Sequence, residues 1–124
     1  MAHIGDSRVY RMRSKTITQL STDHAYLAPR QEGPSVLSSK GRRVLSQALG
    51  THLSITPEIL VHKTQPGDIY ALCSDGLSDF LEDSFIERLL NKATPLATKG
   101  KELIDSAKAR GGHDNITLVL VEVE

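Results

Sequence analysis

The stretch that decides the fold is Gly67-Asp68-Ile69-Tyr70-Ala71-Leu72-Cys73-Ser74-Asp75-Gly76-Leu77-Ser78-Asp79. Its apolar run, residues 69–73, has the length of a β-strand and predicts a central strand buried on both faces. The polar, glycine-containing residues 74–79 predict a loop at the end of that strand. We interpret Cys73 as a small buried apolar residue rather than as a reactive thiol.

Two helices and a strand are predicted after this loop. The first helix has Asp83 or Ser84 as its N-cap, and its apolar face consists of Phe85, Ile86, Leu89 and Leu90. The second begins near Pro95 and ends at Gly111-Gly112, and its inward residues are Leu96, Leu103, Ile104 and Ala107. A run of β-branched residues over 116–123 predicts a closing strand.

The residues before the opening stretch predict a β-hairpin over 8–13 and 16–20 and a further strand over 55–64. Between them, residues 21–50 carry many glycine, proline and serine residues without a sustained period. They predict a long irregular insertion with a helical turn near 44–49. Strands followed by two consecutive helices and a final strand indicate an α+β fold, with a pair of helices on one face of a mostly antiparallel sheet.

The overall composition limits the class of function. The chain has 124 residues, which suits one domain, and its 15 basic residues balance its 15 acidic ones. Because nucleic acids and anionic membranes attract positively charged proteins, this balance argues against both as partners. The apolar runs are too short to cross a membrane, and we expect no signal peptide. A single cysteine excludes an internal disulfide or a multi-cysteine zinc site and favours a cytoplasmic compartment.

Four aspartates beside glycine or asparagine are the candidates for chemistry: Asp6, Asp75, Asp79 and Asp114. Carboxylates on loops at strand ends are the ligands that Mg²⁺ and Mn²⁺ prefer, and these ions keep several waters. Six acidic residues and no basic ones occur between Asp68 and Glu87, a density that favours a bound cation or full solvation. Each aspartate taken alone is better explained as a turn or helix-capping residue.

Five strings taken together resemble the metal-dependent protein phosphatase 2C family of Ser/Thr phosphatases, bacterial type. They are AHIGDSRVYRM, STDH, LSQALG, GDIYALCSDGLSDFL and GGHDNITLVLVEV, and they cover residues 2–124. The resemblance implies Mg²⁺- or Mn²⁺-dependent hydrolysis of phosphoserine and phosphothreonine in a phosphoprotein substrate. In that reaction two metal ions polarise the phosphate and activate a shared water.

The same resemblance implies roles for particular residues. Asp75 and Asp114 correspond to ligands of the two-metal centre, and Asp6 and Asp79 help Asp75 to hold a third, weaker ion. Residues 25–49 correspond to a flap beside the active site. The basic excess of this segment would suit an anionic phosphoprotein, and its arginines would attract the phosphate weakly: Arg30, Arg42 and Arg43. From the charges alone, an ordinary solvated loop explains this excess equally well.

The sequence departs from the family in what it lacks. The family domain is about twice as long, and its first half supplies a phosphate-binding arginine, an acidic pair and a D-G-x-G-G string whose Asp bridges both metals. None of these occurs here. The chain therefore resembles the C-terminal half of the domain, a single partial domain over 1–124 and part of a β-sandwich. We expect it to be inactive alone and to self-associate through exposed sheet edges.

Two other interpretations remain open. The chain could be a non-catalytic phosphatase-like module that binds a phosphoprotein or another partner. It could also be an α+β scaffold whose aspartates only make turns, which requires five family-like strings to occur in order by accident.

Overall fold

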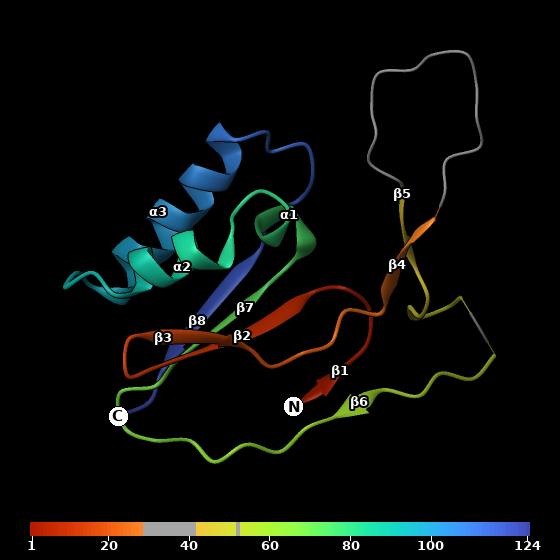
Figure 1. The fold of residues 1–124 in the computed structure, drawn as a ribbon, viewed down its shortest axis with the longest axis horizontal. Coiled ribbons are helices and arrows are strands. Elements are labelled where there is room, and N and C mark those ends of the chain that lie inside the picture. Colours follow the sequence, from red (N-terminus) through yellow and green to blue (C-terminus); the bar gives the residue numbers. More distant parts are fainter. Residues whose placement is uncertain (29–41, 52) are drawn as a thin grey trace.

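The computed structural model describes residues 1–28, 42–51 and 53–124 (Figure 1). Most elements belong to one sheet and the helices that cover it. The elements are β1 (Ala2–His3), β2 (Arg8–Arg13), β3 (Thr16–Gln19), β4 (Ala25–Ala28), β5 (Arg42–Leu45), β6 (Glu58–Ile59), β7 (Ile69–Cys73), α1 (Asp75–Ser78), α2 (Asp83–Leu90), α3 (Leu96–Ala109) and β8 (Leu118–Glu122). Within the described residues, no helix is long and apolar enough to cross a membrane.

The main sheet has four strands in the order β3-β2-β7-β8, and every neighbouring pair is antiparallel. The helices pack against one face of this sheet (Figure 1). The predicted α+β fold, with helices on one face of an antiparallel sheet, is confirmed. The opening stretch supplies the central strand β7, which pairs with β2 on one side and β8 on the other.

The core lies between this face and the helices. Alternate sheet residues point into it, and Tyr10 and Ala71 are paired across β2 and β7. The helices contribute apolar side chains that are almost fully buried, such as Leu77, Ile86 and Leu103. Because side chains alternate along a strand, the residues between these inward positions point to the opposite face.

The opposite face of the sheet is open in the described structure, which corrects the prediction that strand 69–73 is buried on both sides. Leu72 is 40% exposed, and its neighbours on β8, Val119 and Val121, are 51% and 47% exposed. Cys73 is buried, as predicted. A continuous apolar run does not determine whether one face or both faces of its strand are covered. The same run also fits a strand whose second face is exposed until another polypeptide surface packs against it.

Helix boundaries differ from the prediction at the N-terminal ends. Residues 75–78 form α1 rather than a loop. The N-cap of α2 is Glu82, not Asp83 or Ser84, because the Asp83 carboxylate instead accepts a hydrogen bond from the Tyr10 hydroxyl at 2.9 Å. The predicted apolar face of α2 is confirmed, since Ile86, Leu89 and Leu90 are buried.

Two predicted strands are shorter in the structure. Strand 55–64 reduces to β6, because its partner β1 has only two residues to pair with. Strand 116–123 reduces to β8, because Thr117 is bonded to Ser74 beyond the end of β7. The helix over 96–109 stops where Gly111 and Gly112 adopt φ values of +154° and +55°, as the glycine pair predicts.

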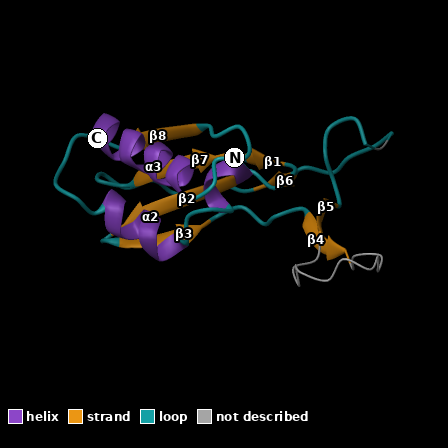
Figure 2. Cartoon of the chain, turned by 90° about the horizontal axis from the view of Figure 1, so that it is seen from above, coloured by secondary structure: helices purple, strands orange, loops and turns teal. Residues whose placement is uncertain are grey.

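The segment 25–49 contains an antiparallel hairpin. Its strands β4 and β5 pair over four residues each, and the hairpin stands beside the main sheet, away from the helices (Figures 1 and 2). The predicted helical turn near 44–49 does not form, because residues 44 and 45 belong to β5. Residues 29–41, the middle of the flap-like segment, lie outside the described residues.

Helix α2 covers the outer edge of β3. The Glu87 carboxylate accepts a hydrogen bond from the Ile17 backbone N–H at 2.8 Å, and the Asn91 side-chain amide donates to the Lys15 carbonyl at 3.0 Å. These bonds satisfy edge groups that another strand would otherwise use. On the other edge of the sheet, β8 pairs with β7 alone among the described strands.

Candidate metal centre

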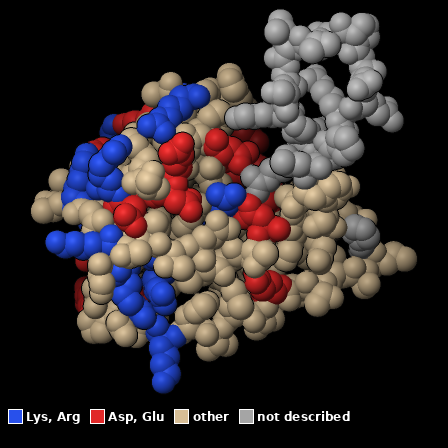
Figure 3. All heavy atoms as spheres, in the orientation of Figure 1, with Lys and Arg blue, Asp and Glu red and all other residues tan. Residues whose placement is uncertain are grey.

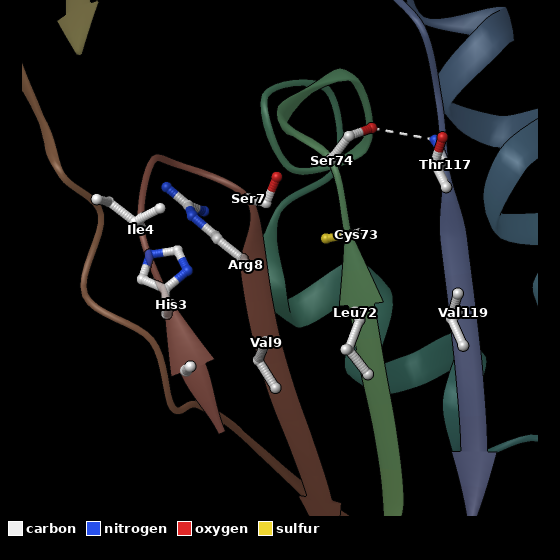
Figure 4. A pocket seen from close by; sticks show the side chains of 11 residues that line it. His3, Ile4, Ser7, Arg8, Val9, Leu72, Cys73, Ser74, Thr117 and Val119 are labelled. Atoms are coloured by element: carbon white, nitrogen blue, oxygen red, sulfur yellow. Dashed lines mark hydrogen bonds between the residues drawn. The ribbon is translucent and has the colours of Figure 1, made fainter. Parts of the chain in front are cut away.

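The start of α1, which carries Asp75, and the loop that carries Asp114 are joined through Ser74. The Ser74 hydroxyl donates to the Asn115 carbonyl and accepts from the Thr117 N–H, both at 3.0 Å. The Ser74 N–H also donates to the Thr117 carbonyl at 3.1 Å. Figure 4 shows the Ser74–Thr117 contact joining the ends of β7 and β8. The residue before Asp75 and the residue after Asp114 are therefore in direct contact.

Gly76 explains how closely these loops approach. A Cβ atom at this position would lie 2.4 Å from the Asn115 carbonyl oxygen, a separation that real Cβ atoms do not reach. Gly76 is buried in α1. A glycine directly after Asp75 thus lets the start of α1 lie against the backbone next to Asp114.

The two carboxylates have similar local bonding. One oxygen of Asp75 accepts the Gly76 N–H at 2.8 Å, and one oxygen of Asp114 accepts the Asn115 N–H at 2.7 Å. Asp75 is half-buried and Asp114 is exposed. Both are bonds between a carboxylate and the backbone N–H of the next residue, and they leave the second oxygen of each carboxylate outside the bond.

The register places the other two aspartates at the same end of the sheet. Arg8 on β2 lies opposite Cys73 on β7, so the turn that contains Asp6 continues beside Ser74 and Asp75. Asp79 is the C-cap of α1, and its N–H donates to the Asp75 carbonyl at 2.8 Å. All four predicted ligands therefore stand at one end of the sheet, Asp75 and Asp79 on α1 and at its C-cap, and Asp6 and Asp114 outside the helices and strands.

These carboxylates do not form a complete metal site by themselves. Across 1–28, 42–51 and 53–124, no group of three His, Cys, Asp or Glu side chains could hold a metal ion. The joined Asp75 and Asp114 loops fit an oxygen-preferring ion that keeps most of its waters, because Mg²⁺ commonly uses only one or two protein carboxylates. They do not fit an ion that requires a closed set of protein ligands.

Two of the three predicted phosphate-attracting arginines belong to the hairpin beside the main sheet. Arg42 and Arg43 belong to β5, which pairs with β4. Arg30 lies outside the described residues. Their predicted role therefore stays a prediction.

A charged network beside the site was not predicted from the sequence. The Arg8 guanidinium donates to both Asp23 oxygens, with an Nη2–Oδ2 distance of 2.8 Å, and its Nη1 donates to the Tyr10 hydroxyl at 3.1 Å. The hydrogen bond to Asp23 is the main cause that raises the pKa of Arg8, and burial raises the pKa of Tyr10. Tyr10 in turn donates to Asp83 at 2.9 Å. The network links β2, the segment after β3, and α2.

Two histidines and Glu58 adjoin this network. The His3 and His24 rings stack with centroids 5.1 Å apart, and the Gly5 N–H donates to His24 Nδ1 at 3.2 Å. Glu58 accepts from the Thr22 N–H and hydroxyl, which together with the nearby histidines lowers its pKa. The string STDH, residues 21–24, was the sequence signal that pointed to this region.

A hollow of about 580 Å³ opens at this end of the uncovered sheet face. Figure 4 shows Val9, Leu72 and Val119 side by side along three strands, with His3, Ser7 and Arg8 toward the loop end. In the view of Figure 3, acidic side chains gather near α1 and the start of α2, and basic ones gather over α2 and α3. The site thus combines acidic side chains near α1 with the apolar side chains of Val9, Leu72 and Val119, which line the hollow.

Comparison with known proteins supplies relatives over nearly the whole chain, although no family model matches it. The chain is 32% identical over 128 residues to a protein phosphatase 2C-type protein of Streptococcus pyogenes, covering 99% of this chain and 52% of that relative. The solved structure of the S. agalactiae serine/threonine phosphatase is similar, with a TM-score of 0.82 and 30% identity over 99% of this chain and 53% of that one.

A structure of the catalytic domain of the serine/threonine phosphatase PstP in complex with two manganese ions is also similar. Its TM-score is 0.74, with 28% identity over 99% of this chain and 53% of that one. The chain therefore spans about half the length of the curated relative and the two solved structures.

Proposed function

Because this chain belongs to the protein phosphatase 2C-type family, we propose that it takes part in the metal-dependent hydrolysis of phosphoserine and phosphothreonine in proteins. The observation that carries the proposal is the direct contact between the loops of Asp75 and Asp114 through Ser74 and Asn115. The PstP relative with two manganese ions supports a metal-dependent reaction. Mg²⁺ and Mn²⁺ share the chemistry required, so either ion suits the proposal.

The proposal gives each residue of the loop end a defined task. Asp75 and Asp114 would hold one ion, and Asp6 and Asp79 would contribute to a further one. A bound ion of this kind neutralises phosphate charge and lowers the pKa of a coordinated water. Ser74 fixes the Asp75 loop against the Asp114 loop, and Gly76 allows their close approach. Arg30, Arg42 and Arg43 would attract the phosphate, as the sequence predicts.

The chain supplies only part of this chemistry. The D-G-x-G-G string of the resembled family does not occur in this sequence, and the described residues contain no three-ligand group. Reactions that depend on two ions sharing a water require a bridging carboxylate and a positioned cation for the phosphate. We therefore expect the 124-residue chain alone to bind metal weakly and to hydrolyse no phosphoester.

Titration with Mn²⁺, followed by the loss of the free-ion electron paramagnetic resonance signal, tests the metal site. We expect weak binding, with Kd in the millimolar range, and at least about a tenfold loss in the Asp75→Asn and Asp114→Asn variants. Asp105→Asn removes the same charge from the exposed side of α3 and should leave binding unchanged. Equal binding by Asp75→Asn and the unaltered chain would remove Asp75 from the site.

Activity toward p-nitrophenyl phosphate and a phosphothreonine peptide at high Mn²⁺ tests the expectation that the chain alone hydrolyses no phosphoester. We expect no metal-dependent turnover by the chain alone. Turnover that Asp75→Asn abolishes would show that the chain completes a catalytic site, for example across two copies, and would overturn its expected inactivity.

A non-catalytic module is the second candidate. The incomplete ligand group among the described residues favours it. Phosphopeptide binding that is independent of Mn²⁺ and unchanged by Asp75→Asn would favour this module over the enzyme.

The proposed partner is a phosphoprotein in a signalling role, and the proposed compartment is the cytoplasm, which the single buried thiol of Cys73 suits. Self-association through the exposed sheet is a further part of the proposal. The exposed apolar side chains of β7 and β8 support it.

A further inference from the structure

The ring of Phe85 on α2 carries two arginine side chains. The Cζ atom of Arg110 lies 4.3 Å from the ring centroid and that of Arg88 lies 5.1 Å from it. Phe85 itself packs against the buried core, so the ring is a fixed platform. Contact with an aromatic ring attracts a guanidinium and restricts its orientation.

Neither arginine has an ion-pair partner within the part of the chain that the structure describes. Among the described residues, the side chain of Arg110 makes one long hydrogen bond, from Nη1 to the Phe80 carbonyl at 3.4 Å. Nearby lysines differ in this respect, because Lys92 pairs with Glu102 and Lys101 pairs with Asp105. Two guanidiniums held at one ring are thus positive charges that no carboxylate pairs with among the described residues, unlike Lys92 and Lys101.

A purely structural role explains this arrangement incompletely. One arginine on Phe85 is enough to hold the end of α3 against α2. A second cation at the same ring adds repulsion between like charges, which an anion bound by both guanidiniums would offset. Guanidinium donors lie in the plane of the group, so contact with a ring leaves N–H groups for planar oxyanions such as carboxylate and phosphate.

The arginine pair is connected to the candidate metal centre. Arg110 is followed by Gly111, Gly112, His113 and Asp114. The His113 ring makes an edge contact with Phe80, at a centroid distance of 6.2 Å, and Phe80 is the residue that Arg110 contacts through its carbonyl. Figure 3 shows the basic area over α2 and α3 adjoining the acidic area near α1.

We propose that Arg88 and Arg110, mounted on Phe85, bind an anionic side chain of a peptide, a carboxylate or a phosphate, beside the Asp75–Asp114 loops. The identity of that peptide as a phosphatase substrate rests on the proposed function. The binding itself does not, because it requires neither metal nor hydrolysis. The substrate class that results is a protein segment with an acidic or second phosphorylated residue near the phosphate to be removed.

Nuclear magnetic resonance titration of the 124-residue chain in EDTA tests the pair directly. The probes are three peptides of one length that carry two glutamates, two phosphoserines or two serines at the same positions. We expect the side-chain Nε–Hε signals of Arg88 and Arg110 to move with both anionic peptides and not with the serine peptide. The anionic peptide that binds more tightly identifies which oxyanion the pair prefers.

Two double variants complete the test. We expect Arg88→Gln with Arg110→Gln to weaken binding of the better anionic peptide roughly tenfold. Lys101→Gln with Lys108→Gln removes the same charge elsewhere on α3 and should leave affinity within about twofold. If the double arginine variant unfolds, Arg88→Gln alone replaces it, because the Arg88 side chain makes no hydrogen bond or ion pair among the described residues.

Each other outcome overturns the proposal. Equal weakening of peptide binding in the lysine variant would show that net charge alone explains the loss of affinity. Movement of other signals while both Nε–Hε signals stay fixed would place binding elsewhere. Failure of both anionic peptides to bind would leave the pair a link between α2 and α3. None of these results would alter the Mn²⁺ and phosphatase tests, which address other residues.

Discussion

The Cys73 thiol is the only sulfhydryl of the chain and is buried at the end of β7. Burial raises its pKa to about 11. At pH about 8 only about one thiol in a thousand is then ionised, and the thiolate is the reactive form. We expect no labelling by a disulfide reagent in the native chain and complete labelling in guanidinium chloride, followed by absorbance. Rapid labelling of native protein would show that the end of β7 opens readily.

Asp68 is fully buried and pairs with Arg13 at 2.7 Å. Its carboxylate also accepts the Gln65 N–H at 2.9 Å. The hydrogen bond from Arg13 is the main cause that holds the pKa of Asp68 well below its usual range. Since the unfolded chain binds this proton more readily, the stabilisation is complete above the unfolded pKa of about 3.9 and is lost as the pH falls toward the folded value.

The change Arg13→Gln tests this pair. We expect a melting temperature lower by at least about 5 °C at neutral pH and a weaker loss of stability between pH about 4 and 2 than in the unaltered chain. Arg11→Gln, on the same strand, is the control, because Arg11 Nε has no hydrogen-bond partner among the described residues. Calorimetric profiles that stay parallel over this pH range would contradict the assignment of the acid loss to Asp68.

At the scale of elements, the long helices were predictable and α1 was not. The apolar spacing of Ile86, Leu89 and Leu90 identified α2 because one face of it is buried. Helix α1 has four residues, includes Gly76, and makes no side-chain cap bond at Ser74, so no local signal favours it. It forms because Leu77 is buried beneath it and because Ser74 is bonded to the Asp114 loop.

The candidate site, like the helices, was predictable from the sequence only in part. The motifs around Asp75 and Asp114 identified their loops, and the structure joins those loops through Ser74. The Arg8–Asp23–Tyr10–Asp83 network escaped prediction because Tyr10 and Asp83 are 73 positions apart. Spacing along the chain contains no signal for such contacts, since the register of β2 against β7 and the position of α2 create them.

At the scale of the whole molecule, one face of the sheet is covered and the other is exposed. Leu72, Val119 and Val121 present apolar surface there, each at least 40% exposed. Burial of such area is worth roughly 25 cal/mol per Å² before the cost of association. The exposed face therefore favours contact with a further polypeptide surface.

Sedimentation velocity over a range of concentrations tests this expectation. We expect concentration-dependent association of the chain, and at least about a tenfold weaker dimer in Leu72→Thr with Val119→Thr. Val61→Thr removes a 92% exposed valine outside the sheet and should leave association unchanged. A chain that stays monomeric at the highest concentration would contradict the expectation.

The hydrogen bonds of Glu87 with Ile17 on β3, and of Asn91 with Lys15 just before β3, also limit how copies of this chain can add to one another. A strand can be added at the β8 edge, whereas Glu87 already occupies the Ile17 N–H on the opposite edge. An assembly that grows by strand addition needs two open ends on every copy to become a filament. Two copies that meet edge to edge at β8 use the open end of both, so this route ends at a closed pair. Removing both side-chain contacts, those of Glu87 and Asn91, is the change that would turn a terminating contact into a propagating one.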